Sequence, residues 1–177
     1  MNLFQLIRSD IAAKADWVYG RVTGGTILQT LLTDGTLAMI LFRLMEGAQR
    51  LKITPLAMIF NKLNVIFGQC IIGRGATFGP GFVLIHSQGV VINTAVRGGS
   101  RIRIEHQVTI GAEKGLAPVL GDDIFIGAGA KVVGGVRIGN GVKIGANAVV
   151  VHSAPDGATM VGIPAKPVGR EEKGPSS

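Results

Sequence analysis

The chain has 177 residues, a length that suits one compact core or a solenoid with a small helical appendage. Hydrophobic residues make up 47% of it and glycine occurs 27 times, which excludes a disordered protein, and the single cysteine, Cys70, excludes an internal disulfide. A formal net charge of +7 favours anionic partners, but the scattered basic residues and only 5% aromatics argue against nucleic acid.

The amino terminus does not have the pattern of a cleavable signal peptide, because Arg8, Asp10 and Lys14 interrupt what would be its apolar core. The longest apolar stretch, 37–42, is far shorter than the roughly twenty residues that a membrane span needs. Together with the lone cysteine, these features predict a cytoplasmic protein. Peripheral contact with a membrane surface stays open.

Residues 1–69 are predicted to form a helical region. Residues 1–18 suit an amphipathic helix that ends before the glycine-rich segment 20–25, and Asp34 is placed to cap a second helix. The apolar stripe of this second helix is Leu37, Ile40, Leu41, Leu44 and Met45, and its polar face carries Arg43, Glu46 and Arg50. Pro55 is suited to the first turn of a third helix. We expect these helices to cap and assemble the rest of the chain rather than to perform chemistry.

Between Ile72 and Val150 an apolar residue recurs at every sixth position. Of the fourteen positions in this phase, thirteen are apolar and only Lys114 is not. A period of six matches neither a helix nor a plain strand; it describes a short strand plus a turn, repeated, with one aliphatic side chain pointing inward each time. The sequence therefore predicts a solenoid over residues 70–155. The segment 111–118 has lost the repeat and is expected to be an extruded loop, and 156–177 to be an extended strip and tail.

This repeat resembles that of the hexapeptide-repeat acyltransferases. The resemblance implies a mainly β fold: a left-handed parallel β-helix with a small amino-terminal α-helical region. It also implies eighteen residues per coil, and hence four to five coils from Ile72 to Pro155. The left hand of the coil is implied by the resemblance alone, since it is the rare hand for a parallel crossover.

His86 lies in Val83-Leu-Ile-His-Ser-Gln-Gly-Val-Val-Ile-Asn93, which resembles the catalytic-histidine segment of serine acetyltransferases and polysaccharide O-acetyltransferases. The resemblance implies that His86 is the general base of an O-acetyltransferase that uses acetyl-CoA. An imidazole, whose pKa in solution is about 6.5, can take a proton from an acceptor hydroxyl at neutral pH. The oxygen so activated attacks the thioester.

His106 is the second catalytic candidate, within a segment that resembles the polysaccharide O-acetyltransferases, Ile104-Glu-His-Gln-Val-Thr-Ile-Gly111. With eighteen residues per coil, Leu84 and Ile102 begin hexads on neighbouring coils. The two histidines are then offset by two residues, with Cα atoms about 8 Å apart, and are expected to frame one cleft. The repeat position of His106 usually holds a small inward-facing residue, which favours a structural role.

Three segments, 126–134, 144–150 and 162–166, resemble those that line the coenzyme A groove in this family. The residues that the resemblance assigns to cofactor binding are Gly111, Ala128, Gly129, Lys131, Ala146, Asn147, Pro164, Lys166 and Arg170. Small residues let a pantetheine arm lie against the backbone, and the cations meet phosphates. Corner glycines have an equally good structural explanation, so 162–166 is the more specific signal. No metal is expected.

The chain departs from serine acetyltransferases at positions that bear on the acceptor. Those enzymes have an aspartate before the catalytic histidine and an Arg-His pair before the proline that follows the loop. Here the positions read Ile85, Leu116 and Ala117, with Pro118 retained. Partners for an amino acid's ammonium and carboxylate are lost, so we expect a saccharide or polysaccharide-precursor acceptor, with serine as the alternative.

Two other classes stay open. A metal protein of the γ-carbonic anhydrase kind would need three histidines around one zinc, and the 46 residues between His106 and His152 place His152 on another face. A non-catalytic scaffold would neither bind coenzyme A nor hydrolyse acetyl-CoA. For assembly, the resemblance implies a homotrimer with active sites between subunits, which would cover the flat apolar faces that a solenoid leaves.

Overall fold

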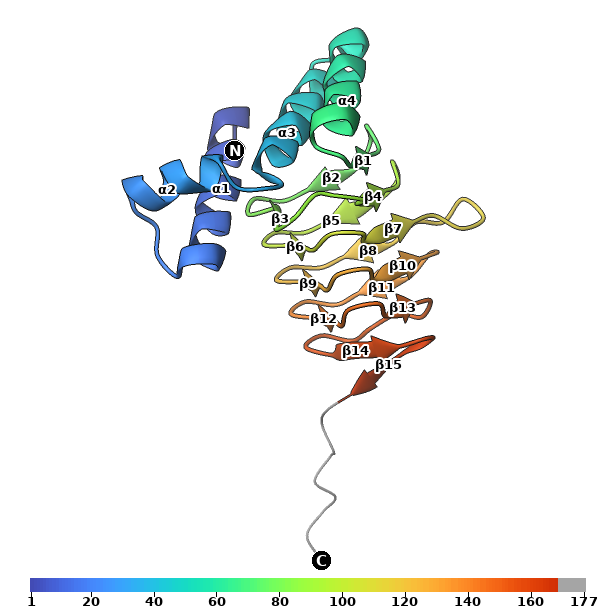
Figure 1. The fold of residues 1–177 in the computed structure, drawn as a ribbon. Helices are drawn as coiled ribbons and strands as arrows, with labels where there is room; N and C mark the ends of the chain where they lie inside the picture. Colours follow the sequence, from blue (N-terminus) through green and yellow to red (C-terminus); the bar gives the residue numbers. More distant parts are fainter. Residues whose placement is uncertain (169–177) are drawn as a thin grey trace, which may run out of the picture.

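The computed structural model describes residues 1–168. Four helices precede a parallel β-solenoid of about four turns (Figure 1). The helices are α1 (Leu3–Tyr19), α2 (Gly24–Leu31), α3 (Thr36–Arg50) and α4 (Thr54–Phe67). Three of them match the predicted helices, and Pro55 opens α4 as expected. α2 begins where the sequence predicts only a break, because the hydroxyl of Thr23 caps it by accepting from the backbone N–H of Thr26.

The solenoid has three faces, and each full turn adds one short strand to each face. Face A contains β1, β4, β7, β10 and β13; face B contains β2, β5, β8 and β11; face C contains β3, β6, β9, β12, β14 and β15. Paired strands are parallel, except that β15 runs antiparallel to β14. The predicted mainly β solenoid with a helical amino-terminal region is confirmed, and its left hand stays a prediction.

The strands are two to four residues long, as a repeat with frequent corners requires. Their bounds are β1 (Ile71–Ile72), β2 (Thr77–Phe78), β3 (Val83–Leu84), β4 (Val91–Ile92), β5 (Arg97–Gly98), β6 (Arg103–Ile104), β7 (Thr109–Gly111), β8 (Val119–Leu120), β9 (Phe125–Ile126), β10 (Lys131–Val133), β11 (Arg137–Ile138), β12 (Lys143–Ile144), β13 (Val149–Val150), β14 (Thr159–Gly162) and β15 (Ala165–Val168).

The six-residue phase correctly predicts the solenoid core, since all thirteen of its apolar residues are buried. The coils are nevertheless not all eighteen residues long. Leu84 pairs with Ile104, twenty residues on, and Gly98 pairs with Leu120, twenty-two residues on. Two extra residues therefore lie at the corner after β3, and four extra residues in the loop after β7. The two insertions together add six residues, which is the length of one hexad. After the loop, the inward-facing residues therefore return to the same six-residue phase, and the periodicity of the sequence reveals neither insertion.

The helices cover one end of the solenoid and part of face C. α4 contacts β1, and α1 and α3 contact β3. Trp17 of α1 stacks on Phe125 of β9 with ring centroids 5.6 Å apart, and the guanidinium of Arg103 lies 5.0 Å from the Trp17 ring centroid. Within residues 1–168, no single helix is long and apolar enough to cross a bilayer; α2 and α3 meet that requirement only when joined across their 85° bend.

Arg43 does not lie on the polar face predicted for it, because its side chain is completely buried between α1, α3 and the first coil. The guanidinium donates to Asp10 at 2.7 Å, to Glu46 at 2.8 Å and to two carbonyl oxygens of the first coil at 2.6 and 2.8 Å. Asp10 also accepts from two backbone N–H groups of that coil. One buried cation thus joins both helices to the solenoid.

Candidate active site

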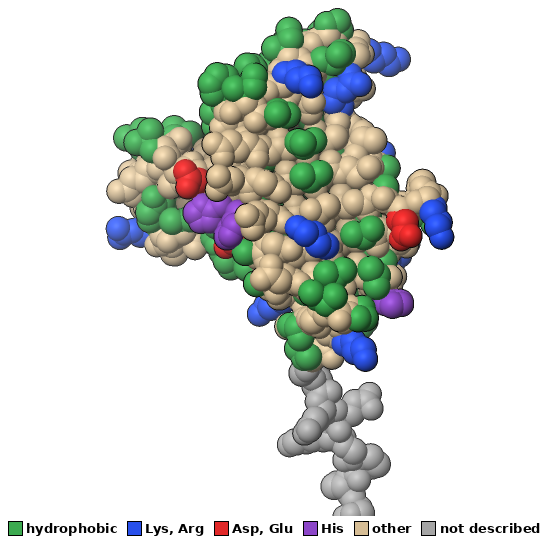
Figure 2. Space-filling model, turned by 45° about the vertical axis from the view of Figure 1, so that its right-hand side comes forward, with side chains coloured by type: hydrophobic (Ala, Val, Ile, Leu, Met, Phe, Trp, Pro, Cys, Tyr) green, Lys and Arg blue, Asp and Glu red, His purple; other side chains and the backbone are tan. Residues whose placement is uncertain are grey.

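His86 and His106 occupy the same corner of the solenoid on neighbouring coils. Because Leu84 pairs with Ile104, each histidine follows its strand of face C by two residues, and the two are in register. Their ring centroids are 6.1 Å apart, edge to face, and they form one patch on the surface (Figure 2). The predicted two-residue offset is therefore wrong, because the two extra residues at this corner lengthen the coil to twenty.

A cavity of about 700 Å³ lies between this corner and the helices. Both histidines line it, which confirms the prediction that they frame one cleft. The other lining residues are Leu31, Leu32, Thr33, Asp34, Gly35, Leu37, Phe67, Gly68, Gln69, Ser87 and Gln88. The wall opposite the solenoid thus comes from the end of α2, the loop that follows it and the end of α4. Sequence reasoning assigned none of these to the site, because the repeat pattern says nothing about where the helices dock.

Asp34 is the main charged residue of that wall. The predicted helix cap is wrong: the N-cap of α3 is Gly35, and no side chain caps this helix. Instead, the carboxylate Oδ2 of Asp34 lies 3.5 Å from Nδ1 of His86. Gly35 makes this possible, since its φ is 77° and a Cβ there would lie 2.5 Å from the carbonyl oxygen of Leu84.

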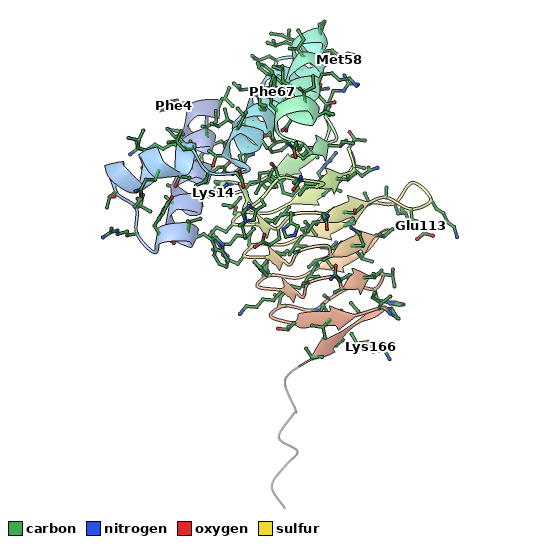
Figure 3. All side chains as sticks on the ribbon, viewed as in Figure 1. Phe4, Lys14, Met58, Phe67, Glu113 and Lys166 are labelled. Atoms are coloured by element: carbon green, nitrogen blue, oxygen red, sulfur yellow. The ribbon has the colours of Figure 1, made fainter. Side chains whose placement is uncertain are left out.

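Lys14 of α1 is buried where the helices meet the solenoid (Figure 3). Its Nζ donates to the carbonyl oxygen of Leu84 at 2.8 Å and to the carbonyl oxygen of Asp34. Burial lowers the pKa of Lys14 to about 8, although Asp34 and Glu105 oppose this shift. The lysine fastens the loop that carries Asp34 to the strand that leads to His86.

The lowered pKa of Lys14 predicts a measurable dependence of stability on pH. Between pH 8 and 10.5 the unfolded chain still holds the proton that folded Lys14 has lost, so the free energy of unfolding rises with pH by about 3 kcal/mol across this window. Lys14→Met removes this contribution. Denaturant unfolding of both proteins at pH 7.5 and 10 checks it, and parallel pH dependences would show that Lys14 titrates normally.

His106 is half-exposed rather than inward-facing, so the structural position expected for it is wrong. The insertion after β3 shifts the phase by two residues and places His106 at the outer corner. Its Nδ1 lies 3.7 Å from Oε2 of Glu105, and its side chain is 45% exposed. Each imidazole of the site therefore has a carboxylate near Nδ1, Asp34 for His86 and Glu105 for His106.

Small side chains continue the line of the histidines along the corner. Strand pairing places five residues at equivalent positions, the corner row: His86, His106, Ala128, Ala146 and Gly162. Gly129 and Asn147 turn the chain at this corner with φ of 72° and 57°. Lys131 lies beside the row and donates to the carbonyl oxygen of Gln107 at 2.6 Å. The structure thus places five predicted coenzyme residues, Ala128, Gly129, Lys131, Ala146 and Asn147, along the corner that carries the histidines.

The other predicted coenzyme residues are dispersed. Pro164 and Lys166 belong to the β14–β15 hairpin at the lower end of the solenoid (Figure 3). Gly111 ends β7, at the opposite edge of face A from the corner row, so one chain does not bring it to the site. Arg170 lies outside the described residues.

The predicted loop is extruded from the corner between faces A and B. Glu113 and Leu116 close it with two backbone hydrogen bonds of 2.9 Å, and Glu113 lies on the far side of the solenoid from Lys14 (Figure 3). His152 follows β13 at this same corner, so it lies on another face from His106, as the spacing predicts. Among residues 1–168, no three His, Cys, Asp or Glu side chains are grouped to hold a metal ion.

Comparison with known proteins agrees with this architecture. Residues 117–152 match the family model described as bacterial transferase hexapeptide (six repeats). The serine acetyltransferase of Helicobacter pylori is 33% identical over 174 residues, which cover 96% of each chain. The solved soybean serine acetyltransferase complexed with serine has a TM-score of 0.85 at 30% identity, covering 94% of this chain and 69% of that one. A serine acetyltransferase in complex with CoA has a TM-score of 0.85 at 26% identity, with the same coverage. This chain therefore belongs to the serine acetyltransferase family of hexapeptide-repeat acyltransferases.

Proposed function

We propose that this protein is a serine O-acetyltransferase, which transfers the acetyl group of acetyl-CoA to the hydroxyl of serine. The names of its relatives support serine as the acceptor. The comparisons do not support the saccharide that the sequence favours. The structural observation that carries the proposal is the corner row, in which two neighbouring imidazoles, packed edge to face, meet a line of small residues at the edge of a cavity.

His86 is the proposed general base. With Nδ1 beside Asp34, Nε2 is the nitrogen that faces the acceptor. It takes the proton of the acceptor hydroxyl while that oxygen forms a bond to the acetyl carbonyl carbon. As the carbon–sulfur bond breaks, the imidazolium returns the proton to the departing sulfur. His106 borders the same space and is proposed to contact the acceptor there.

The corner row fits acetyl-CoA, whose thioester supplies an activated acyl carbon. At Ala128, Ala146 and Gly162 the side chains are too small to cover the backbone, so a thin pantetheine arm can lie against it. Lys166, at the lower end of the solenoid, is an exposed cation suited to a phosphate. The histidines lie at the other end of the row, where the thioester of a coenzyme bound along the row would have to lie.

A neutral hydroxyl acceptor, such as a saccharide, is the second candidate. Among the described residues that line the cavity, lysine and arginine are missing, so one chain offers serine's carboxylate no cation. Ile85, Leu116 and Ala117 likewise lack the charges expected for an amino acid. Ile85 is buried, which removes its side chain from the cavity.

Acetyl transfer to serine, nucleotide sugars and oligosaccharides, measured side by side as release of coenzyme A, tests the proposal. We expect serine to be acetylated with the highest kcat/KM. Transfer to a sugar in preference to serine would reject serine as the acceptor and favour the second candidate. Neither transfer nor stabilisation by coenzyme A would reject the enzyme assignment for a scaffold.

We further propose that the active protein is a homotrimer. The loop 111–118 leaves the solenoid at the corner of face A opposite the histidines, so it can reach a histidine corner only on another chain. Exposed Ile71 and Val91 on face A also need cover. Light scattering at micromolar concentration should give a mass three times the 18.4 kDa of one chain. A monomer under these conditions would contradict the proposal.

A further inference from the structure

We propose that Asp34 is the positioning residue for His86. The inference rests on the proposed role of His86 as the base. Asp34 Oδ2 lies 3.5 Å from Nδ1 of His86, whereas the neighbouring carboxylate, Glu105, lies 3.7 Å from Nδ1 of His106. Each imidazole thus has a different carboxylate near its Nδ1. The carboxylate beside His86 belongs to the helical region rather than to the solenoid.

The backbone of Asp34 is fixed relative to the strand that precedes His86. Gly35 approaches the carbonyl oxygen of Leu84 so closely that a Cβ there would lie 2.5 Å from it. Lys14 donates to the carbonyl oxygens of both Asp34 and Leu84. Two contacts therefore hold the loop against β3, and only the side chain of Asp34 remains free to adjust.

A carboxylate in this place selects the useful tautomer of the imidazole. When Nδ1–H donates to Asp34, the lone pair lies on Nε2, which must accept the acceptor's proton. The same negative charge stabilises the imidazolium that forms during transfer. The 3.5 Å separation is slightly longer than an ordinary hydrogen bond, and such bonds in unliganded sites tighten when the substrate binds. The Asp34 side chain is 83% exposed, so it has room for this movement.

Asp34→Asn, with Asp34→Glu and Asp16→Asn beside it, tests the inference. Asp16 is an exposed carboxylate of α1 that does not line the cavity, so its variant is the matched control for loss of one negative charge. We expect Asp34→Asn to lower kcat by about tenfold or more, with the KM for serine and the Tm little changed. Asp34→Glu should recover part of the rate, and Asp16→Asn should match the unaltered protein.

Nitrogen-15 NMR of the His86 ring gives a second reading that needs no turnover. We expect the Nδ1–H tautomer in the unaltered protein and a mixture in Asp34→Asn. An unchanged tautomer and kcat would overturn the inference while leaving His86 as the base. A raised KM for serine at unchanged kcat would overturn it too, and would show that Asp34 binds the acceptor's ammonium. If the unaltered protein transfers no acetyl group, the proposed function itself fails.

Discussion

Replacing His86 with alanine is expected to lower kcat by about 10² to 10⁴, the usual contribution of a general base. The acceptor hydroxyl then has to lose its proton to water, so the loss falls on the chemical step. Coenzyme A binding should persist, because the small residues of the corner row lie on other coils. Steady-state kinetics with serine, together with a titration of coenzyme A, measure the two effects separately.

His152→Ala is the matched control for this experiment. His152 is an exposed histidine that does not line the cavity of its own chain and lies two coils below the loop 111–118, so its loss should leave kcat unchanged. If His86→Ala keeps the full rate, His86 has no part in proton transfer. If it loses coenzyme A binding as well as rate, the cofactor and the imidazole share more of the site than the corner row indicates.

Replacing Arg43 with alanine is expected to lower the free energy of unfolding by about 3 to 5 kcal/mol, the usual effect of removing one partner from a buried ion pair. Asp10 would then be buried without its guanidinium partner, and Glu46 would keep only its ion pair with Arg50. Two carbonyl oxygens of the first coil would also lose their donor. Urea unfolding at neutral pH measures the change.

Arg101→Ala is the control, because Arg101 makes an ion pair with Asp123 at the surface, where both side chains are about half exposed. Solvent screens exposed pairs of this kind, so the Arg101 variant should lose several times less stability than the Arg43 variant. Equal losses would mean that the buried cluster does not hold the helices to the solenoid. A change in the denaturant slope would indicate that the helical region unfolds on its own.

The strands of the solenoid could be predicted from the sequence, because the same need for an inward-facing apolar residue recurs at every sixth position. Each coil has to fill a narrow core with one aliphatic residue per side, and the thirteen apolar residues of the phase do so. The positions of the corners could not be predicted with the same accuracy. An insertion at a corner changes no inward residue, and the two insertions together restore the phase. The relative placement of His86 and His106 was therefore wrong by two residues.

The contribution of the helical region to the site could not be predicted from sequence patterns. Asp34 before a helix indicates a cap, and only the docking of the loop on Leu84 turns it toward His86 instead. Arg43 on a helix indicates a solvated face, and only the nearby carbonyl oxygens of the first coil make its burial favourable. In both cases a tertiary contact more than thirty residues away decides the role of a charged side chain.

The unequal coil lengths determine where new chemistry could be added to this protein. Successive members of the corner row are separated by 20, 22, 18 and 16 residues, as the strand pairing requires. To engineer a metal site by adding a third histidine to the corner row, the substitution would therefore have to be made at position 128. A fixed step of eighteen from His106 would give position 124, where Ile124 is completely buried, and the engineered side chain would disrupt the core instead of facing solvent.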